Sequence, residues 1–580
     1  MAVFRKFREN IKLSIWDYID SVHRILRIST VIVSVFALGV MLYFYGFPQT
    51  EQTRFFCSVI IYCSLVFYVF KYFLFAFFSV HSIQYIRKHW IEGVVILFII
   101  SGFVLSLADI TTVLLRSYFF IFFVLLLVEL SYIGDFLGKI RMGPGGLLIS
   151  SFLGLILIGT LLLLLPEMSV NGISFIDALF TATSASCITG LSALEIGMDL
   201  TFKGQFVILL LIQLGGINMV CFASFLVYFY KGGRLRYQSV MKEMLNTTLQ
   251  NSRNLTREIV LYTLFIELAG FAFLFVHFSL TQTYSDSISD NIFLSAFHAI
   301  ASFNNAGFCF LDGGMTNALF RYDYYIQTVT MILIFLGGIG FLTMHDILSR
   351  PKEGKNRWKD LQITTKVVLK LSLIFILFGA VSFFILEFNN TSADTPLLDR
   401  IYTAFFTSIS SRTAGFNVIE IPDLNMSTRL ILLVLMLIGA APGSTSGGIK
   451  LTTLYILFKS AIATASGKRQ VTMYRRSVSF EMVDKAYLVL VFTVIVILAG
   501  SFILTITDSQ FSLDEILFEV SSAFGTAGVS SGVTASLSAF GKFIIVITMF
   551  IGRITVLRLA LSIAKRTNAR YSLAETNLGI

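Results

Sequence analysis

Four segments of the chain share a run of small and aromatic residues that ends in a glycine followed by an apolar residue. They read IDALFTATSASCITGLS (residues 176–192), LSAFHAIASFNNAGF (294–308), YTAFFTSISSRTAGFN (402–417) and ILFEVSSAFGTAGVS (516–530). Their glycines, spaced by 117, 108 and 113 residues, are Gly190, Gly307, Gly415 and Gly528. No Asp or Glu lies between the small residues and the glycine in any segment. Since glycine leaves carbonyl oxygens accessible, this pattern favours binding of a monovalent cation, potassium first, by the backbone.

A second glycine site follows each of these glycines after 25, 30, 24 and 24 residues: Gly215-Gly216, Gly337-Gly338, Gly439 and Gly552. The second set can be explained as small-residue contacts between membrane helices. The first set cannot, because it lies in polar segments beside Thr and Asn. Both glycine sites recur four times with a nearly constant separation between them, which indicates an internal repeat of roughly 110 residues. This is much longer than the ~20–50 residues of a solenoid unit.

A repeat of this length suits two membrane spans joined by a re-entrant loop. A helix near residues 177–186 is too short to cross a bilayer, which needs ~20 residues, but it can enter from outside and stop midway. Asp177 near its start suits the positive end of the helix dipole. The chain must then return without helical hydrogen bonds, which is tolerated only inside protein or beside water. Four such strands around one axis would form a ring of carbonyl oxygens that replaces an ion's hydration shell.

The composition identifies the surroundings of these elements. Of the 580 residues, 56% are apolar and only 13% are charged, and the mean hydropathy is +0.82. A soluble chain could not bury so much apolar side chain, which excludes a soluble enzyme, a secreted disulfide scaffold and a disordered chain. We therefore predict an all-α integral membrane protein. About twelve apolar runs could span a bilayer, starting near Thr30, Phe55, Ile91, Leu114, Gly146, Phe206, Ile259, Ile326, Val367, Leu430, Ala486 and Phe543.

The net charge of +10 is explained by the orientation of these spans. Of the 44 Lys and Arg residues, 30 fall in segments assigned to the inside and 8 in segments assigned to the outside. The positive-inside rule then places both termini in the cytoplasm. The positive charge therefore requires no nucleic acid as a partner. The five cysteines have neither metal-ligand spacing nor the even number of a disulfide framework.

The four glycine segments resemble the filter loops of the Trk/Ktr/HKT superfamily of potassium transporters, with membrane subunits of the TrkH and KtrB type closest in style. The motifs that carry the resemblance are Thr189-Gly190-Leu191, Phe303-Asn304-Asn305-Ala306-Gly307-Phe308, Ser411-Arg412-Thr413-Ala414-Gly415-Phe416 and Ala523-Phe524-Gly525-Thr526-Ala527-Gly528. The resemblance covers about residues 141–566. It implies a monomer of four tandem helix–pore-loop–helix repeats in a pseudo-four-fold arrangement.

The resemblance also implies which residues meet the ion. Carbonyl groups would come from the two residues before each filter glycine: Ile188, Thr189, Asn305, Ala306, Thr413, Ala414, Thr526 and Ala527. Glycine in all four filters resembles the potassium-selective members rather than those that carry sodium. Members of the family dimerise and work with a cytosolic nucleotide-binding regulatory subunit of the TrkA/KtrA type. We accordingly expect a homodimer in the lipid of a plasma membrane, the bacterial inner membrane, with potassium as the ion and no organic cofactor.

These expectations divide the chain into seven parts. They are a cytoplasmic N-terminal segment (1–28), about four extra transmembrane helices (29–142), pore repeats 1 to 4 (143–230, 257–349, 365–464 and 483–566) and a cytoplasmic tail (567–580).

The third repeat contains a candidate gate. A helix through all of 429–459 would be about 46 Å long, more than the ~30 Å hydrocarbon core. It is interrupted by Gly439, Pro442, Gly443, Ser444, Thr445, Ser446, Gly447 and Gly448. Either this is an ordinary kinked helix or, as in the family, an intramembrane loop (439–448) obstructs the pore. It is not a phosphate-binding loop, because Ile449 separates the glycine from Lys450 and no strand precedes it.

Three further polar residues lie close to these segments. Arg553 lies inside the last span, where an arginine needs a polar partner. We expect it to contact carbonyl groups of the 439–448 loop or, alternatively, to form a structural salt bridge. Arg412 is interpreted as bracing the third filter, and His298 as a packed side chain.

Other classes of membrane protein fit the sequence less well. A voltage-gated channel would need an arginine at every third position of a span, which the sequence lacks. A channel for another monovalent cation such as sodium, or a cation-coupled secondary transporter, remains an alternative. Only one span is clearly broken, which counts against the secondary transporter. We expect no enzymatic activity, because the chain has no H-E-x-x-H motif and no paired intramembrane Asp.

Overall fold

The computed structural model describes residues 28–78, 144–229, 252–281, 287–311, 313–348, 357–391, 395–468 and 470–554. The spans predicted to begin near Ile91 and Leu114, the tail 567–580 and residues 1–27 lie outside this part of the chain. The described residues are mostly helical, which confirms the prediction of a helical chain. Strand among them is confined to one antiparallel hairpin of β1 (Thr472–Met473) and β2 (Arg476–Ser477).

The chain divides into two compact units. The described part of the smaller unit includes a helical hairpin, formed by Ile28–Gly46 and α2 (Glu51–Phe78). Its two helices share a cluster of buried side chains: Ala37, Met41, Ile61, Leu65 and Tyr68. Gln49 closes the turn by donating to the carbonyl groups of Tyr43 and Phe47.

In the larger unit a long helix, a shorter helix and a further helix follow one another four times. The first group comprises α7 (Pro144–Leu163), α8 (Phe175–Cys187) and α10 (Phe202–Phe229). The second comprises α12 (Ser252–Thr281), α13 (Ile288–Phe303), α15 (Tyr324–Gly338) and α16 (Phe341–Leu348). The third comprises α18 (Ile363–Leu386), α19 (Leu397–Ser410), α20 (Met426–Leu437) and α21 (Leu451–Ala465). The fourth comprises α22 (Phe480–Thr507), α23 (Leu513–Gly525) and α24 (Ala539–Ile554).

Short helical turns connect these helices. They are η1 (Pro166–Met168), α9 (Ile196–Asp199), η2 (Gly314–Thr316), α14 (Ala318–Arg321), α17 (Arg357–Asp360), η3 (Ile421–Asp423) and η4 (Thr534–Ser536).

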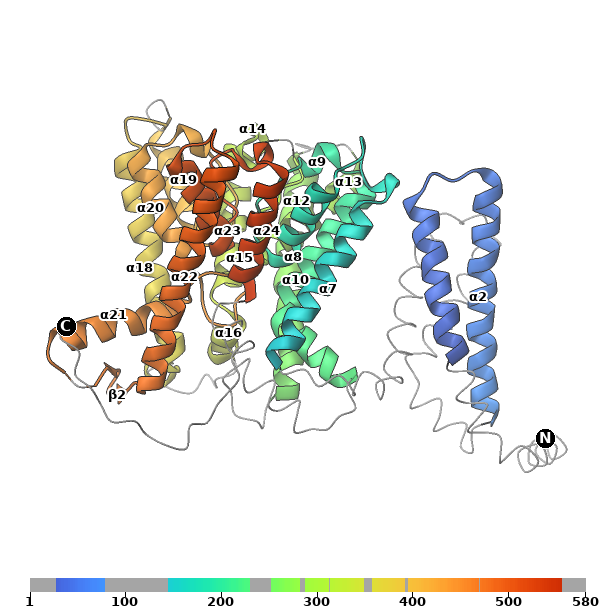
Figure 1. Cartoon of the computed structure of the whole chain (residues 1–580), viewed down its shortest axis with the longest axis horizontal. Coiled ribbons are helices and arrows are strands. Elements are labelled where there is room, and N and C mark those ends of the chain that lie inside the picture. The colour runs from blue at the N-terminus through green and yellow to red at the C-terminus, as the bar shows by residue number, and fades with distance from the viewer. Residues whose placement is uncertain are drawn as a thin grey trace. The chain divides into compact units, whose positions relative to one another are not determined.

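Helix packing follows the same order in each group (Figure 1). The short helices α8, α13, α19 and α23 each pack against the first helix of their own group, α7, α12, α18 and α22. Between groups, α15 packs against α19, α20 against α23, and α24 against α8. The last of these contacts joins the fourth group to the first.

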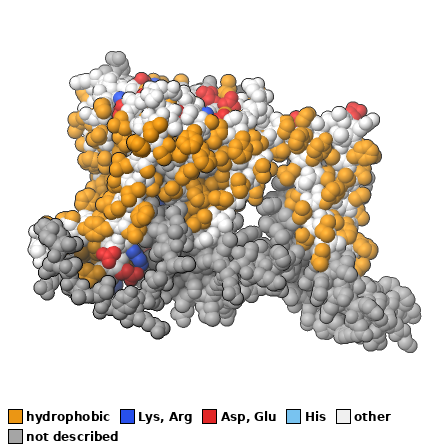
Figure 2. Space-filling view, viewed as in Figure 1, with side chains coloured by type: hydrophobic (Ala, Val, Ile, Leu, Met, Phe, Trp, Pro, Cys, Tyr) orange, Lys and Arg blue, Asp and Glu red, His pale blue; other side chains and the backbone are white. Residues whose placement is uncertain are grey.

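Helix lengths are compatible with a membrane. The described residues contain five helices long and apolar enough to cross one, or six if a bent pair counts as one span. Large apolar side chains on these helices point outward, among them Phe265, Phe502 and Ile385. Figure 2 shows hydrophobic side chains over the middle of the larger unit's visible face, with the visible charged side chains near its ends. This distribution is the one expected for helices whose sides face lipid.

The bent pair corrects one expectation from the sequence. The span predicted to begin near Ile326 is broken by 93° between α15 and α16, so the 439–448 loop is not the only clear interruption. Gly340 lies at the bend with a φ of +81°, a left-handed conformation that favours glycine. The sequence did not indicate this break, because the residues around it are apolar and include no proline.

Candidate functional site

The four glycine segments share an unusual backbone conformation. The residue two positions before each glycine has a positive φ, with values of 56°, 59°, 80° and 49° at Ile188, Asn305, Thr413 and Thr526. These four account for most of the six non-glycine residues with positive φ in the described part of the chain. The glycines themselves have φ of 91°, 70°, 78° and 75°. Such strain persists only where the surrounding structure enforces it, and it is frequent at functional sites.

Hydrogen bonds from the short helices hold these segments in place. Each segment donates a backbone N–H to a carbonyl five residues earlier, in the manner of a helix C-cap. The bonds are Thr189 to Ser184 (2.8 Å), Ala306 to Ala301 (2.8 Å), Gly415 to Ser410 (3.3 Å) and Ala527 to Ser522 (2.9 Å). The conformation of each segment is therefore set by the end of the short helix before it.

The four glycines meet one another in chain order. A Cβ added to Gly190 would lie 2.8 Å from the Ala306 oxygen, and one on Gly307 would lie 2.8 Å from the Ala414 oxygen. One on Gly415 would lie 3.0 Å from the Ala527 oxygen, and one on Gly528 would lie 2.3 Å from the Thr189 oxygen. Each glycine thus faces the carbonyl before the next glycine, and the fourth faces the first. The eight residues two and one before the glycines are all buried.

The second glycine set lies where further helices touch the short helices. A Cβ would lie 2.2 Å from the Ser186 oxygen at Gly215, 1.9 Å from the Phe303 oxygen at Gly337 and 2.0 Å from the Phe524 oxygen at Gly552. The interpretation as small-residue contacts therefore fits these three. Gly439 differs, because its added Cβ would meet the oxygen of Gly447 in the same loop.

The loop 439–448 leaves helical structure between α20 and α21. Ile438 and Ile449 form a parallel bridge across its base. Gly443 and Gly448 have φ of 74° and 65°. Of the residues identified from the sequence, Ser444, Thr445 and Ser446 are buried. Ser444 donates to the Ala441 carbonyl at 2.6 Å, which partly meets the polar needs of the loop.

Hydrogen bonds join this loop to the second and fourth groups. The Gly447 N–H donates to Thr526 Oγ1 at 2.7 Å, which joins the loop to the fourth glycine segment. The Ala441 N–H donates to the Gly338 carbonyl at 3.2 Å, and the Phe341 N–H donates to the Gly443 carbonyl at 3.3 Å. The loop of the third group is therefore docked in the break between α15 and α16.

Arg553 makes a hydrogen bond that was not predicted from the sequence. Its Nη2 donates to the Gly215 carbonyl in α10 at 2.8 Å, and its guanidinium lies 5.9 Å from the Phe152 ring centroid. This hydrogen bond joins the fourth group to the first, and the expected contact with the 439–448 loop stays a prediction. The partner lies 338 residues upstream, the distance that also separates Gly190 from Gly528.

The other two polar residues lie as interpreted. Arg412 Nη1 donates to the Ser372 carbonyl in α18 at 3.1 Å, and so ties the third glycine segment to the first helix of its group. His298 is buried, bonds to Thr330 Oγ1 at 2.8 Å, and packs against Phe320 and Phe416.

Ion pairs and a hydrogen bond near the starts of three short helices were not predicted from the sequence. Asp177 near the start of α8 pairs with Lys542 on α24 at 2.7 Å, and Asp514 on α23 pairs with Arg429 on α20 at 3.2 Å. Tyr324 on α15 donates to Asp399 on α19. All three join neighbouring groups. The available signal was an acidic residue in the first turn of every short helix: Asp177, Asp290, Asp399 and Asp514.

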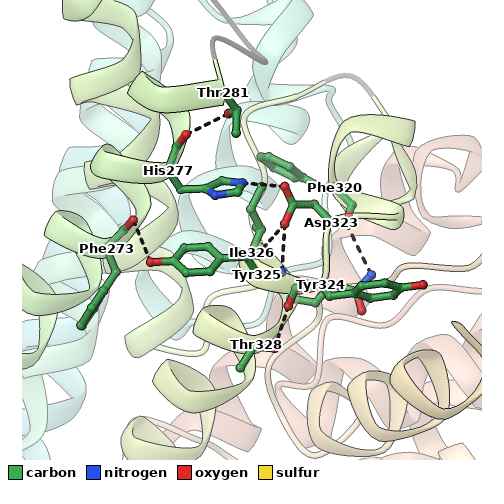
Figure 3. Close-up of polar contacts among 10 residues, drawn as sticks. Phe273, His277, Thr281, Phe320, Asp323, Tyr324, Tyr325, Ile326 and Thr328 are labelled. Carbon is green, nitrogen blue, oxygen red and sulfur yellow. Dashed lines mark hydrogen bonds and ion pairs between the residues drawn. The ribbon is translucent and has the colours of Figure 1, made fainter. Parts of the chain in front are cut away.

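One such end is shown in Figure 3. His277 on α12 points toward Asp323, and its Nε2 lies 2.6 Å from Asp323 Oδ2. Asp323 also caps α15, because its Oδ1 accepts from the N–H groups of Tyr325 and Ile326. The Tyr325 ring stacks on His277 with centroids 4.6 Å apart. This cluster fixes the start of α15 against α12.

Within the described ranges, no group of three or more His, Cys, Asp or Glu residues could hold a metal ion. The carbonyl oxygens of the four glycine segments, which lie close to one another, are the candidate site for a cation.

Comparisons with known proteins find a family and relatives that this chain resembles over most of its length. Residues 146–572 match the TrkH family, described as cation transport protein. The chain is 36% identical over 446 residues to the Ktr system potassium uptake protein B of Bacillus subtilis, covering 76% of this chain and 98% of that protein. It is 33% identical over 449 residues to the potassium/sodium uptake protein NtpJ of Enterococcus hirae, covering 76% of this chain and 97% of that protein.

A solved structure shares the fold. The crystal structure of the potassium transporter TrkH from Vibrio parahaemolyticus superposes with a TM-score of 0.62 at 17% identity. The match covers 81% of this chain and 97% of that chain.

Proposed function

The chain belongs to the TrkH family of cation transport proteins, the Trk/Ktr superfamily, and from this premise we propose that it carries potassium into the cell through a central pore. The observation that carries the proposal is the closed succession of four glycines, each facing the carbonyl before the next glycine. The four segments have strained backbones and buried residues, and they lie against one another. Their carbonyl oxygens are therefore suited to replace the hydration shell of an ion. The names of the relatives, potassium uptake proteins, favour potassium as that ion.

In this proposal the four groups of helices are pore repeats arranged with pseudo-four-fold symmetry. The residues at −2 and −1 form the filter with their glycines: Ile188, Thr189, Gly190, Asn305, Ala306, Gly307, Thr413, Ala414, Gly415, Thr526, Ala527 and Gly528. About four additional N-terminal spans precede the repeats. The family match begins at residue 146, which is consistent with that boundary.

The loop 439–448 would act as the gate. Its support is its position, since it is hydrogen-bonded to Thr526 of the fourth filter segment and docked in the break of the second repeat. Arg553 would add a positive charge beneath the filter. Its support is the hydrogen bond to Gly215, whose position faces the carbonyl at the end of the first short helix. If Arg553→Ala or deletion of residues 443–446 leaves potassium flux unchanged, this gate is ruled out.

We further propose a homodimer in the lipid of a bacterial inner membrane, with both termini in the cytoplasm. Regulation would come from a cytosolic nucleotide-binding subunit. The bacterial relatives that belong to a named Ktr system favour this arrangement, and the distribution of Lys and Arg favours the orientation.

Sodium permeation is the second candidate. The Enterococcus hirae relative is named a potassium/sodium uptake protein, which favours sodium as an additional ion. Coupled secondary transport also gains support, because the described residues contain a bent helix pair, α15 and α16, in addition to the interruption at 439–448 that the sequence indicated.

Purified protein in liposomes tests these candidates. Flux of K⁺, Rb⁺, Na⁺ and Li⁺ is measured with and without an opposing sodium or proton gradient. Flux of K⁺ and Rb⁺ well above that of Na⁺ and Li⁺ supports the potassium filter. Equal flux of Na⁺ and K⁺ overturns it, and flux that requires a sodium or proton gradient shows coupled transport. Failure to restore growth of a potassium-uptake-deficient bacterium at micromolar potassium, with any plausible cytosolic partner, would count against potassium uptake altogether.

A further inference from the structure

A buried carboxylate lies behind the second filter segment. Glu267, on α12, is 5% exposed. Its Oε1 accepts from Asn304 Nδ2 at 3.0 Å, and its Oε2 accepts from Gln213 Nε2 at 2.9 Å. Asn304 Nδ2 also donates to Gln213 Oε1 at 3.1 Å, which closes a three-membered ring of hydrogen bonds. The three side chains come from three elements, α10 of the first repeat, α12 of the second and the end of α13.

Asn304 connects this ring to the filter. It is fully buried, lies three residues before Gly307, and directly precedes Asn305, the left-handed residue of the second filter segment. Its side chain also fills the space beside Gly216, where an added Cβ would lie 1.8 Å from its Oδ1. A shift of Asn304 would therefore move both the second filter segment and its contact with the first repeat.

The third filter segment has a comparable support. Arg412 lies three residues before Gly415 and donates to the Ser372 carbonyl on α18. In both repeats the residue at the −3 position thus reaches back to the first helix of its own repeat. The second repeat differs in using a carboxylate inside a membrane span. Such a group is costly to bury unless it is hydrogen-bonded.

We propose that Glu267 is a positioning residue for the second filter segment. Its two oxygens fix Asn304 and Gln213, and thereby set the position of the Asn305 and Ala306 carbonyl groups on which selection of potassium over sodium depends. This inference rests on the proposed function.

The test compares three variants in liposomes by the ratio of K⁺ to Na⁺ flux. Glu267→Ala removes both acceptors, and we expect the ratio to fall roughly tenfold, equivalent to about 1.4 kcal/mol. Glu267→Gln keeps an acceptor for Asn304 but places an amide NH2 group against the Gln213 Nε2 donor, so we expect a smaller loss than in Glu267→Ala. The control is Thr263→Val in the same helix, because Thr263 is buried but its hydroxyl has no hydrogen-bond partner among the described residues. It should keep the wild-type ratio.

A double-mutant cycle tests the route through Asn304. If Glu267 acts through Asn304, the ratio for Glu267→Ala combined with Asn304→Ala should be close to that of Asn304→Ala alone. Additive effects would overturn the proposal. So would an unchanged ratio in Glu267→Ala. Absence of potassium flux in the wild-type protein would instead contradict the proposed function itself.

Discussion

The hydroxyl of Thr526 accepts a hydrogen bond from the backbone N–H of Gly447 at 2.7 Å. Thr526 belongs to the proposed fourth filter segment, and Gly447 belongs to the loop 439–448 of the third group. An added Cβ on Gly447 would lie 2.5 Å from this hydroxyl oxygen, so no side chain fits between them. The proposed filter and the proposed gate are therefore in direct contact.

Removing this contact should release the loop. Thr526→Val keeps the side-chain shape but removes the acceptor, and it leaves the buried Gly447 N–H unpaired. Loss of one such bond costs about 1 kcal/mol, so we expect basal potassium flux in liposomes to rise about fivefold. Thr526→Ser keeps the hydroxyl and should match the wild-type protein. Equal flux in Thr526→Val and the wild-type protein would contradict a holding role for this bond.

Filter glycines should not tolerate a side chain. Gly190→Ser places a Cβ 2.8 Å from the Ala306 oxygen, and we expect the K⁺ to Na⁺ flux ratio to fall at least about tenfold, the equivalent of ~1.4 kcal/mol. Gly172→Ser is the matched control, because Gly172 also has a positive φ of 75° but has open space around it. It carries the same backbone strain, roughly 1–2 kcal/mol, without the collision. Equal loss of selectivity in both variants would mean that strain, not contact with the next segment, is responsible.

Asp323 should stabilise the start of α15. Asp323→Ala removes the helix cap and the contact with His277 (Figure 3), and we expect a loss of about 1–2 kcal/mol in unfolding free energy. The loss should appear as a lower Tm of the detergent-solubilised protein. Asp323→Asn retains an acceptor for the cap and should lose less. A Tm unaffected by Asp323→Ala would show that neighbouring contacts hold α15 without it.

Lys542 and Asp177 should stabilise the contact between the first and fourth groups of helices. Their side chains are only 11% and 20% exposed, so breaking the pair should cost on the order of 1–3 kcal/mol, between the surface and buried limits. Lys542→Met should therefore lower the Tm. Adding Asp177→Asn to Lys542→Met should recover part of the loss, because it removes the unpaired carboxylate. If the double variant is less stable than Lys542→Met, the ion pair does not explain the effect of that substitution.

The sequence allowed correct prediction where only one or two residue types fit the required backbone conformation. The repeated glycines were found because only glycine fits a position that faces another carbonyl, and the 439–448 interruption because Pro442 and four glycines break a helix. The bend at Gly340 was missed because its neighbours are apolar and read as a continuous span. Nothing in the sequence around Gly340 indicates that this bend accommodates the loop 439–448 of another group.

Partners distant in the chain could not be predicted. Arg553 and Glu267 stand out in apolar helices, so a polar partner was required in each case. Which partner depends on how the helices meet. Gly215 lies 338 residues from Arg553, the distance that also separates Gly190 from Gly528, and Asn304 lies 37 residues from Glu267. Only the first of these distances corresponds to the spacing of the repeated glycines.

The closed succession of glycines and carbonyl groups has an evolutionary consequence. A side chain at position 190 is limited by residue 306, position 307 by residue 414, position 415 by residue 527, and position 528 by residue 189. A mutation in one segment therefore alters which mutations are acceptable in another segment more than a hundred residues away in the chain, and the dependence returns to its origin after four steps. Such circular epistasis would keep the four segments alike at these positions, however far the helices around them diverge.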